Sequence, residues 1–120
     1  MSWQVLFADE FLGEFQCFEL ELKERILASV ELLQDFGPQL RRPHVDTLKQ
    51  SKHQNMKELR LDASGGIWRV AFAFDPERKA ILLVAGDKSG GSQTRFYREL
   101  IRKADQRFER HLVALKHRKD

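Results

Sequence analysis

The sequence has little cysteine, no long apolar run and no leader-like start. Its single cysteine, Cys17, cannot form an internal disulfide, and the apolar, helix-like residues around it indicate a packing role rather than a nucleophile. No apolar run approaches the roughly 18 residues that a membrane helix needs. The first residues lack the basic segment and apolar core of a signal peptide. We therefore expect a cytoplasmic protein that has no membrane partner.

Metal and cofactor signatures are also missing. The four histidines are scattered, and with one cysteine they offer no closely spaced ligand set for zinc. The sequence contains no GxGxxG fingerprint, no P-loop and no GxSxG motif. Paired carboxylates of the glycosidase kind cannot be assigned, because most acidic residues lie in an expected helical region. We expect no cofactor and, if the protein is an enzyme, a metal-independent activity.

Length and composition predict one globular domain over residues 1–120. The chain is long enough for one modest core, and 42% hydrophobic with 32% charged residues is a globular balance. The net charge is only +3, but residues 88–119 are predominantly basic whereas the first third is rich in acid. This asymmetry fits a polyanionic partner on one side of the molecule, and it also fits an ordinary solvated helix face.

The first third predicts a strand followed by a long helical region. Residues 3–7 have strand character, and Asp9 is a plausible helix cap. Apolar residues then recur at three- and four-residue steps over residues 9–36, with a break expected near Gly13–Cys17 because the region exceeds a typical helix length. Gly37-Pro38 should end this region, since glycine caps helices and proline cannot continue them.

The remainder predicts a connector, a three-stranded meander and a closing helix. Residues 39–55 read as a basic, irregular connector. Alternating residues predict strands within Met56–Lys88, with a turn at Asp75–Arg78, and Ala80–Ala85 is apolar enough for a central strand. Ser92 can cap the last helix. The fold class is therefore α+β: an N-terminal strand and helical region, an antiparallel meander and a C-terminal helix.

The first hairpin has a register that its side chains dictate. Keeping the apolar residues of both strands on one face requires Leu61 opposite Trp68, with a four-residue loop at Ala63–Gly66. This register places Arg60 directly opposite Arg69. Two like charges in that position cost up to about 1 kcal/mol, so either an anionic ligand or the neighbouring Glu58 with solvent should balance them.

A cluster of cations and one aromatic hydroxyl carries the candidate chemistry. Guanidinium forks suit phosphate, and they can stabilise the charge that develops when a ribose 2′-hydroxyl attacks its own phosphodiester. An acid and a base would complete that reaction, and His53, Lys52 or Tyr97 could serve. The candidate catalytic residues are Arg60, Arg69, Lys88, Tyr97 and His53, and the candidate substrate-binding residues are Lys52, Lys57 and Glu58.

Four segments in this order resemble a known family. They are the ELR strand at Glu58–Arg60, the WRV strand at Trp68–Val70, the apolar strand ending in GDK at Gly86–Lys88, and FYRELI in the last helix. Together, SKHQNMKELRLDASGGIWRVAFAFD, ILLVAGDK and RFYRELIRKAD resemble the HigB-like branch of the RelE/ParE superfamily of bacterial toxins. The resemblance spans most of the chain.

The resemblance implies a microbial RNase-like fold and a type II toxin that cleaves messenger RNA on the ribosome and so inhibits translation. It also implies a helix-turn-helix antitoxin as partner, in a toxin–antitoxin hetero-oligomer. Arg60 and Arg69 match the arginines that hold the scissile phosphate, Lys88 matches the basic residue after the final strand, and Tyr97 is a looser match. Two alternatives remain, a ParE-like toxin that inhibits DNA gyrase and a non-enzymatic nucleic-acid-binding protein.

Overall fold

The computed structural model describes residues 2–119 and confirms the α+β class. Its elements are β1 (Gln4–Phe7), α1 (Asp9–Gln16), α2 (Leu20–Phe36), the 3-10 turn η1 (Gly37–Gln39), β2 (Val45–Thr47), β3 (Met56–Ala63), β4 (Gly66–Phe74), β5 (Lys79–Asp87) and α3 (Gln93–Lys119). Among the helices of this part of the chain, none is long and apolar enough to span a membrane.

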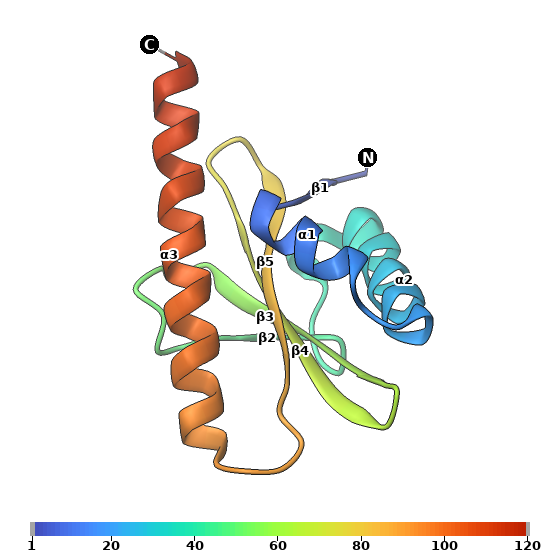
Figure 1. The fold of residues 1–120 in the computed structure, drawn as a ribbon. Coiled ribbons are helices and arrows are strands. Elements are labelled where there is room, and N and C mark those ends of the chain that lie inside the picture. Colours follow the sequence, from blue (N-terminus) through green and yellow to red (C-terminus); the bar gives the residue numbers. More distant parts are fainter. Residues whose placement is uncertain (1, 120) are drawn as a thin grey trace.

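The five strands form one sheet with helices on both faces. The strand order is β1-β5-β4-β3-β2; β1 runs parallel to β5, and the other neighbours are antiparallel. In Figure 1, α1 and α2 cover one face of this sheet and the long helix α3 crosses the other. β5 therefore lies inside the sheet with both faces covered, as its continuous apolar sequence predicted.

Alternation along β4 divides the interior into two cores. Val70 and Phe72 pack with Phe11 and the apolar residues of α2, whereas Ala71 and Ala73 belong to the core beneath α3. Side chains in a strand point alternately to the two faces, so one strand supplies both cores. The same alternation places Arg69, two residues before Ala71, on the sheet face that α3 covers.

The N-terminal helical region breaks as expected, although its cap differs from the prediction. α1 ends at Gln16 and α2 begins at Leu20, and Gly37 ends α2 with a φ of +54°. Asp9 is not the cap: Ala8 holds that position and makes no side-chain capping bond. Asp9 instead begins the helix, where its negative charge favours the helix dipole.

The first hairpin has the predicted register and a shorter loop. Arg60 pairs with Arg69 and Leu61 pairs with Trp68, as predicted. The four-residue loop was wrong, because the ladder continues until Ala63 pairs with Gly66. The turn is therefore Ser64-Gly65 alone, with φ values of +52° and +74°. Two successive positive φ values match the strand twist, and glycine at the second position makes them accessible.

The connector contains a short strand that was not predicted. β2 spans only Val45–Thr47 and pairs antiparallel with β3 at the sheet edge. Three residues are too few for an alternating pattern to be recognised. After β2 the loop docks on α3, where the buried carboxylate of Asp105 accepts bonds from the Ser51 hydroxyl and the Lys52 N–H.

The two later connections follow the predictions. The Arg78 N–H donates to the Asp75 carbonyl at 2.9 Å, which closes the turn that contains Pro76. The Ser92 hydroxyl accepts a bond from the Arg95 N–H at 3.3 Å, so Ser92 does cap α3. The first connection fixes where β5 starts, and the second fixes where α3 starts and so places Tyr97 in the first turns of that helix.

Candidate functional site

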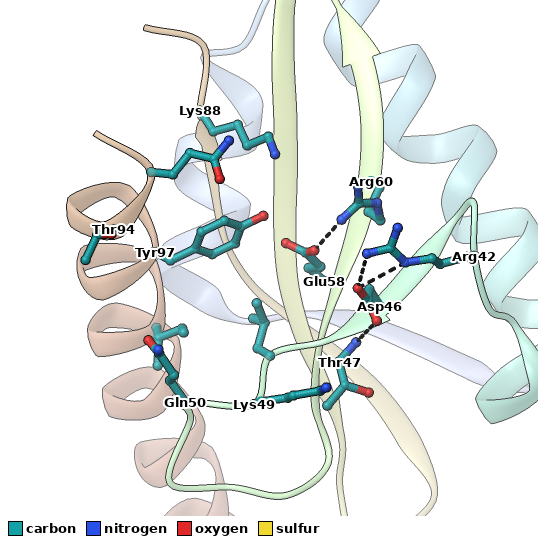
Figure 2. A pocket seen from close by; sticks show the side chains of 13 residues that line it. Arg42, Asp46, Thr47, Lys49, Gln50, Glu58, Arg60, Lys88, Thr94 and Tyr97 are labelled. Carbon is teal, nitrogen blue, oxygen red and sulfur yellow. Dashed lines mark hydrogen bonds and ion pairs between the residues drawn. The ribbon is translucent and has the colours of Figure 1, made fainter. Parts of the chain in front are cut away.

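A cleft of about 500 Å³ lies between the β2–β3 edge of the sheet and the first turns of α3. Figure 2 shows side chains that come from the connector with β2, from β3, from the loop after β5 and from the start of α3. The residues that line it are Arg42, Asp46, Thr47, Leu48, Lys49, Gln50, Glu58, Arg60, Lys88, Gln93, Thr94, Tyr97 and Ile101. Three of the predicted catalytic residues, Arg60, Lys88 and Tyr97, are thus brought together.

Glu58 holds the centre of this cleft. Alternation along β3 places Glu58 and Arg60 on the α3 face, and the Arg60 Nη1 donates to the Glu58 Oε2 at 2.8 Å (Figure 2). Only 3% of Glu58 is exposed. Its second oxygen, Oε1, has no hydrogen-bond partner among the residues that the structure describes. A buried carboxylate oxygen without a hydrogen-bond partner is costly in a purely structural role, and this makes Glu58 a candidate functional residue.

Arg69 lies behind Glu58 rather than in the cleft. It is 5% exposed, and its Nε stands 3.7 Å from the Glu58 Oε1, beyond hydrogen-bond distance. Its Nη1 donates to the Trp68 carbonyl at 3.0 Å. Arg69, predicted as a catalytic residue, therefore does not line the cleft as Arg60 does. Arg60 faces the cleft, whereas Arg69 supports Glu58 from β4, because the middle of the sheet is more deeply covered than its edge.

Tyr97 and Lys88 face Glu58 from the other side of the cleft (Figure 2). The pKa of the Tyr97 hydroxyl is raised, first by burial and then by the nearby Glu58 carboxylate, with Arg69 opposing. The pKa of Lys88 is lowered, first by burial and then by the charges of Arg69 and Arg60. The Lys88 Nζ lies 5.9 Å from the centre of the Tyr97 ring. Tyr97 therefore keeps its proton, and Lys88 releases its own more readily than an ordinary lysine.

Sequence reasoning missed Arg42 and Asp46. Arg42 donates from Nη2 to the Asp46 Oδ2 at 2.6 Å, and this exposed pair forms one wall of the cleft (Figure 2). The bond raises the pKa of Arg42 and lowers that of Asp46. The only signal in the sequence was the basic pair Arg41-Arg42 before Pro43. This pair alone does not indicate a site, because Arg42 meets Asp46 only through the short strand β2, which the sequence pattern does not predict.

Three other predicted residues lie outside the cleft. His53 packs edge-on against Phe108, with its Nε2 3.6 Å from Glu109, well along α3 from Tyr97. Lys57 alternates with Glu58 and so points to the opposite sheet face. Lys52 lines a neighbouring cavity instead. The structure therefore offers no place for His53 or Lys57 in the cluster, although Glu58, predicted as a substrate contact, is at its centre.

The cleft suits an anion that carries several oxygens. It combines an arginine fork, a lysine, a protonated phenol and a carboxylate with an open acceptor. This set supplies positive charge, a proton donor and a proton acceptor within one hollow, which is what phosphoryl chemistry at a ribose hydroxyl requires. Within residues 2–119, no three histidine, cysteine, aspartate or glutamate side chains gather closely enough to hold a metal ion.

Comparison with known proteins assigns the family. Residues 13–109 match the model of the family described as "Phage derived protein Gp49-like (DUF891)". The chain is 47% identical over 94 residues to the candidate toxin HigB2 of Mycobacterium tuberculosis, and 46% identical over 89 residues to the candidate toxin HigB3 of the same organism. The matches cover 78% and 74% of this chain. They span about half of HigB2, 46%, and 75% of HigB3.

Solved structures share the fold at low sequence identity. The chain resembles the Escherichia coli toxin RelE, in a free, doubly arginine-to-alanine substituted form, with a TM-score of 0.64 and 14% identity over 89% of this chain and 98% of that one. It also resembles RelE in the archaeal RelE–RelB complex from Pyrococcus horikoshii, with a TM-score of 0.55 and 17% identity over 76% and 100% of the two chains. The chain therefore has a RelE-like fold. This chain belongs to the Gp49-like family, in its HigB-related branch.

Proposed function

We propose that this protein is the toxin of a type II toxin–antitoxin pair and acts as an endoribonuclease on ribosome-bound messenger RNA. The observation that carries the proposal is the Glu58 carboxylate, bonded to Arg60 on one oxygen and without a hydrogen-bond partner on the other, at a cation-rich cleft. The family relationship to HigB proteins and the RelE-like fold support it.

Glu58 is the proposed general base. A ribose 2′-hydroxyl placed in the cleft donates its proton to the Glu58 carboxylate, one oxygen of which has no hydrogen-bond partner, and the 2′-oxygen attacks the adjacent phosphorus. Arg60 keeps the carboxylate oriented through the 2.8 Å bond to its other oxygen. This assignment replaces His53, which the structure holds against Phe108 and Glu109.

The proposed general acid lies on the opposite wall. As the bond from phosphorus to the 5′-oxygen breaks, that oxygen takes a proton from Tyr97 or Lys88, which both face the cleft. Tyr97 is protonated across the neutral range because its pKa is raised. Lys88 is a stronger acid than an ordinary lysine because its pKa is lowered. The products are a 2′,3′-cyclic phosphate and a free 5′-hydroxyl.

The positive side chains of the cleft stabilise the negative charge that develops on the phosphate during the reaction. Arg60 and Lys88 face the position that a phosphate would occupy, and only Glu58 balances them there, since Asp46 is engaged by Arg42. Charge that develops on the phosphate oxygens is then met by donors that are already in place. The cleft is open to solvent, so a larger partner such as the ribosome is expected to position the RNA within it.

A helix-turn-helix antitoxin is the proposed regulatory partner. The archaeal relative with the same fold is found as a RelE–RelB complex, which supports a toxin–antitoxin assembly here. An antitoxin segment that covers the cleft would place acidic or apolar side chains over Arg60 and Lys88 and so exclude RNA.

The test replaces Glu58 by glutamine, which keeps shape and hydrogen bonding but cannot accept the proton. Glu58→Gln should lose cleavage of messenger RNA on programmed ribosomes while the protein stays folded and still binds them. Exposed Glu31 on α2 supplies the matched control, and Glu31→Gln should cleave at the original rate. Cleavage by Glu58→Gln at the original rate, with the same cyclic phosphate ends, would refute the proposed base.

A further inference from the structure

A second hollow adjoins the cleft along α3. Its volume is about 670 Å³, and it shares Gln50, Thr94 and Ile101 with the cleft, so the two hollows meet without an intervening element. Its other lining residues are Lys52, Arg98, Arg102, Asp105, Gln106 and Glu109. We call this hollow the α3 groove. None of its charged side chains takes part in the proposed chemistry.

The part of the α3 groove nearest the cleft is positively charged. Within residues 2–119, neither Lys52 nor Arg98 forms an ion pair, and Arg102 makes only an exposed one with Glu99 at 3.0 Å. The Asp105 carboxylate is 7% exposed, and both its oxygens accept bonds from the Ser51–Lys52 loop, so it is turned away from the open side of the groove. Two free cations and one weakly held cation therefore face this hollow.

The structure separates these cations from the rest of the basic helix. Arg107 and Arg110, farther along α3, bind Glu14 and Glu10 of α1, so their charges are already paired. Arg98 and Arg102 lie one helical turn apart, about 6 Å along the axis, on the groove face. Their spacing presents consecutive positive charges to an extended polyanion that leaves the cleft.

The geometry points to the α3 groove as the binding subsite for the RNA segment on the 3′ side of the cut phosphate. This inference rests on the proposed function, in which Tyr97 stands on the leaving-group side of the phosphate. The nucleotide that carries the leaving 5′-oxygen therefore lies toward α3, and the next phosphates reach Lys52 and Arg98. Glu109, farther along α3, adds a negative charge to the groove lining, so the contact should extend over only a few nucleotides.

The experiment measures binding of the purified protein to RNA that it cannot cleave. Oligonucleotides with 2′-deoxyribose at the cut position are lengthened one nucleotide at a time on the 3′ or the 5′ side, and affinity is followed by fluorescence anisotropy at several salt concentrations. Lengthening on the 3′ side should tighten binding and then saturate. We call this increase in affinity on 3′ lengthening the 3′ gain, and it should vanish in Lys52→Ala/Arg98→Ala. The slope of log affinity against log salt should shrink by about 1.4 in this variant, since each lost phosphate contact removes about 0.7.

A matched control removes two charges from the opposite side of α3. Arg95 and Lys103 are exposed and line a separate cavity, and Arg95→Ala/Lys103→Ala should keep the full 3′ gain. An unchanged 3′ gain in Lys52→Ala/Arg98→Ala, a gain confined to the 5′ side, or no length dependence in the unsubstituted protein would each overturn the subsite. Because the RNA is uncleavable, loss of the subsite and loss of the nuclease mechanism are separate results.

Discussion

Arg60 stands directly opposite Arg69 across β3 and β4, and the carboxylate of Glu58 meets both guanidinium groups on the same sheet face. Two arginines in that position repel each other by up to about 1 kcal/mol, and Glu58 offsets this cost. The two arginines are not equivalent. Arg69 is buried beside Glu58, whereas Arg60 is at the cleft surface, so their replacement should have different effects.

Arg60→Ala should abolish most activity with little effect on the fold. Loss of one charge-assisted contact to the transition state costs about 2.7–4 kcal/mol, or roughly 10²–10³ in rate. Single-turnover cleavage on programmed ribosomes measures this loss. Arg110→Ala, which removes an exposed arginine far from the cleft, is the control and should cleave normally. Equal rates for Arg60→Ala and the control would contradict the assignment.

Arg69→Ala should instead destabilise the protein. Glu58 and Arg69 are both buried, and removing one member of a buried ion pair costs about 3–5 kcal/mol when the other charge is left unpaired. Arg60 still binds Glu58 in this variant, so the expected loss of unfolding free energy lies below that range. Arg60→Ala should cost much less, since water can reach its place at the cleft surface. Urea unfolding of the two variants separates these cases. The same loss of unfolding free energy in both variants would show that burial does not distinguish the two arginines.

The cleavage rate should fall as the pH rises, and the fall should begin at a lower pH than the pKa of an ordinary lysine would give. The pKa of Lys88 is lowered by burial and by Arg69 and Arg60, so Lys88 loses its charge and its proton before an ordinary lysine does. The pKa of Tyr97 is raised, so its hydroxyl stays protonated across the same interval. Lys88→Met should cleave more slowly and lose this alkaline decline. A decline that persists unchanged in Lys88→Met would assign it to another group.

An adjacent helix-turn-helix protein should neutralise the toxin by covering the cleft. Co-expression of the two proteins should restore growth, and a complex should be recovered by affinity purification. In the complex, Lys88 and Lys49, which both line the cleft, should be protected from amine acetylation, whereas Lys23 on α2 serves as the internal reference. Growth rescue without protection of the cleft lysines would place the antitoxin elsewhere on the surface.

Much of the fold could be predicted because its signals are local. Alternation in β3 and β4 determined the pairing of Arg60 with Arg69, and Gly37 and Ser92 marked real helix boundaries. The hairpin loop was predicted too long because apolar alternation ends at Leu61, whereas backbone pairing continues to the Ser64-Gly65 turn. Backbone hydrogen bonds do not need an apolar side chain, so the apolar pattern predicts strands that are shorter than the paired strands of the structure.

The site was predictable only in part because depth and distance are tertiary properties. The sequence indicated that Glu58 and Arg60 share one face of the sheet, and it named Arg60 and Tyr97 as members of one candidate cluster. It could not show that Arg69 is buried behind Glu58, or that the loop carrying His53 docks against Phe108 rather than turning into the cleft. Arg42 was missed for the same reason, since its place depends on an edge strand of three residues.

The central claim is attack by a ribose 2′-hydroxyl in the cleft, and one substitution in the substrate tests it most directly. Programmed ribosomes carrying messenger RNA with either ribose or 2′-deoxyribose at the cut nucleotide are incubated with the protein, and the RNA ends are mapped. The account predicts cleavage of the ribose substrate to a 2′,3′-cyclic phosphate and no cleavage of the deoxyribose substrate, which should still bind. Equal cleavage of both substrates would contradict the mechanism, and intact RNA accompanied by inhibition of DNA supercoiling would assign the chain to the gyrase-inhibiting alternative.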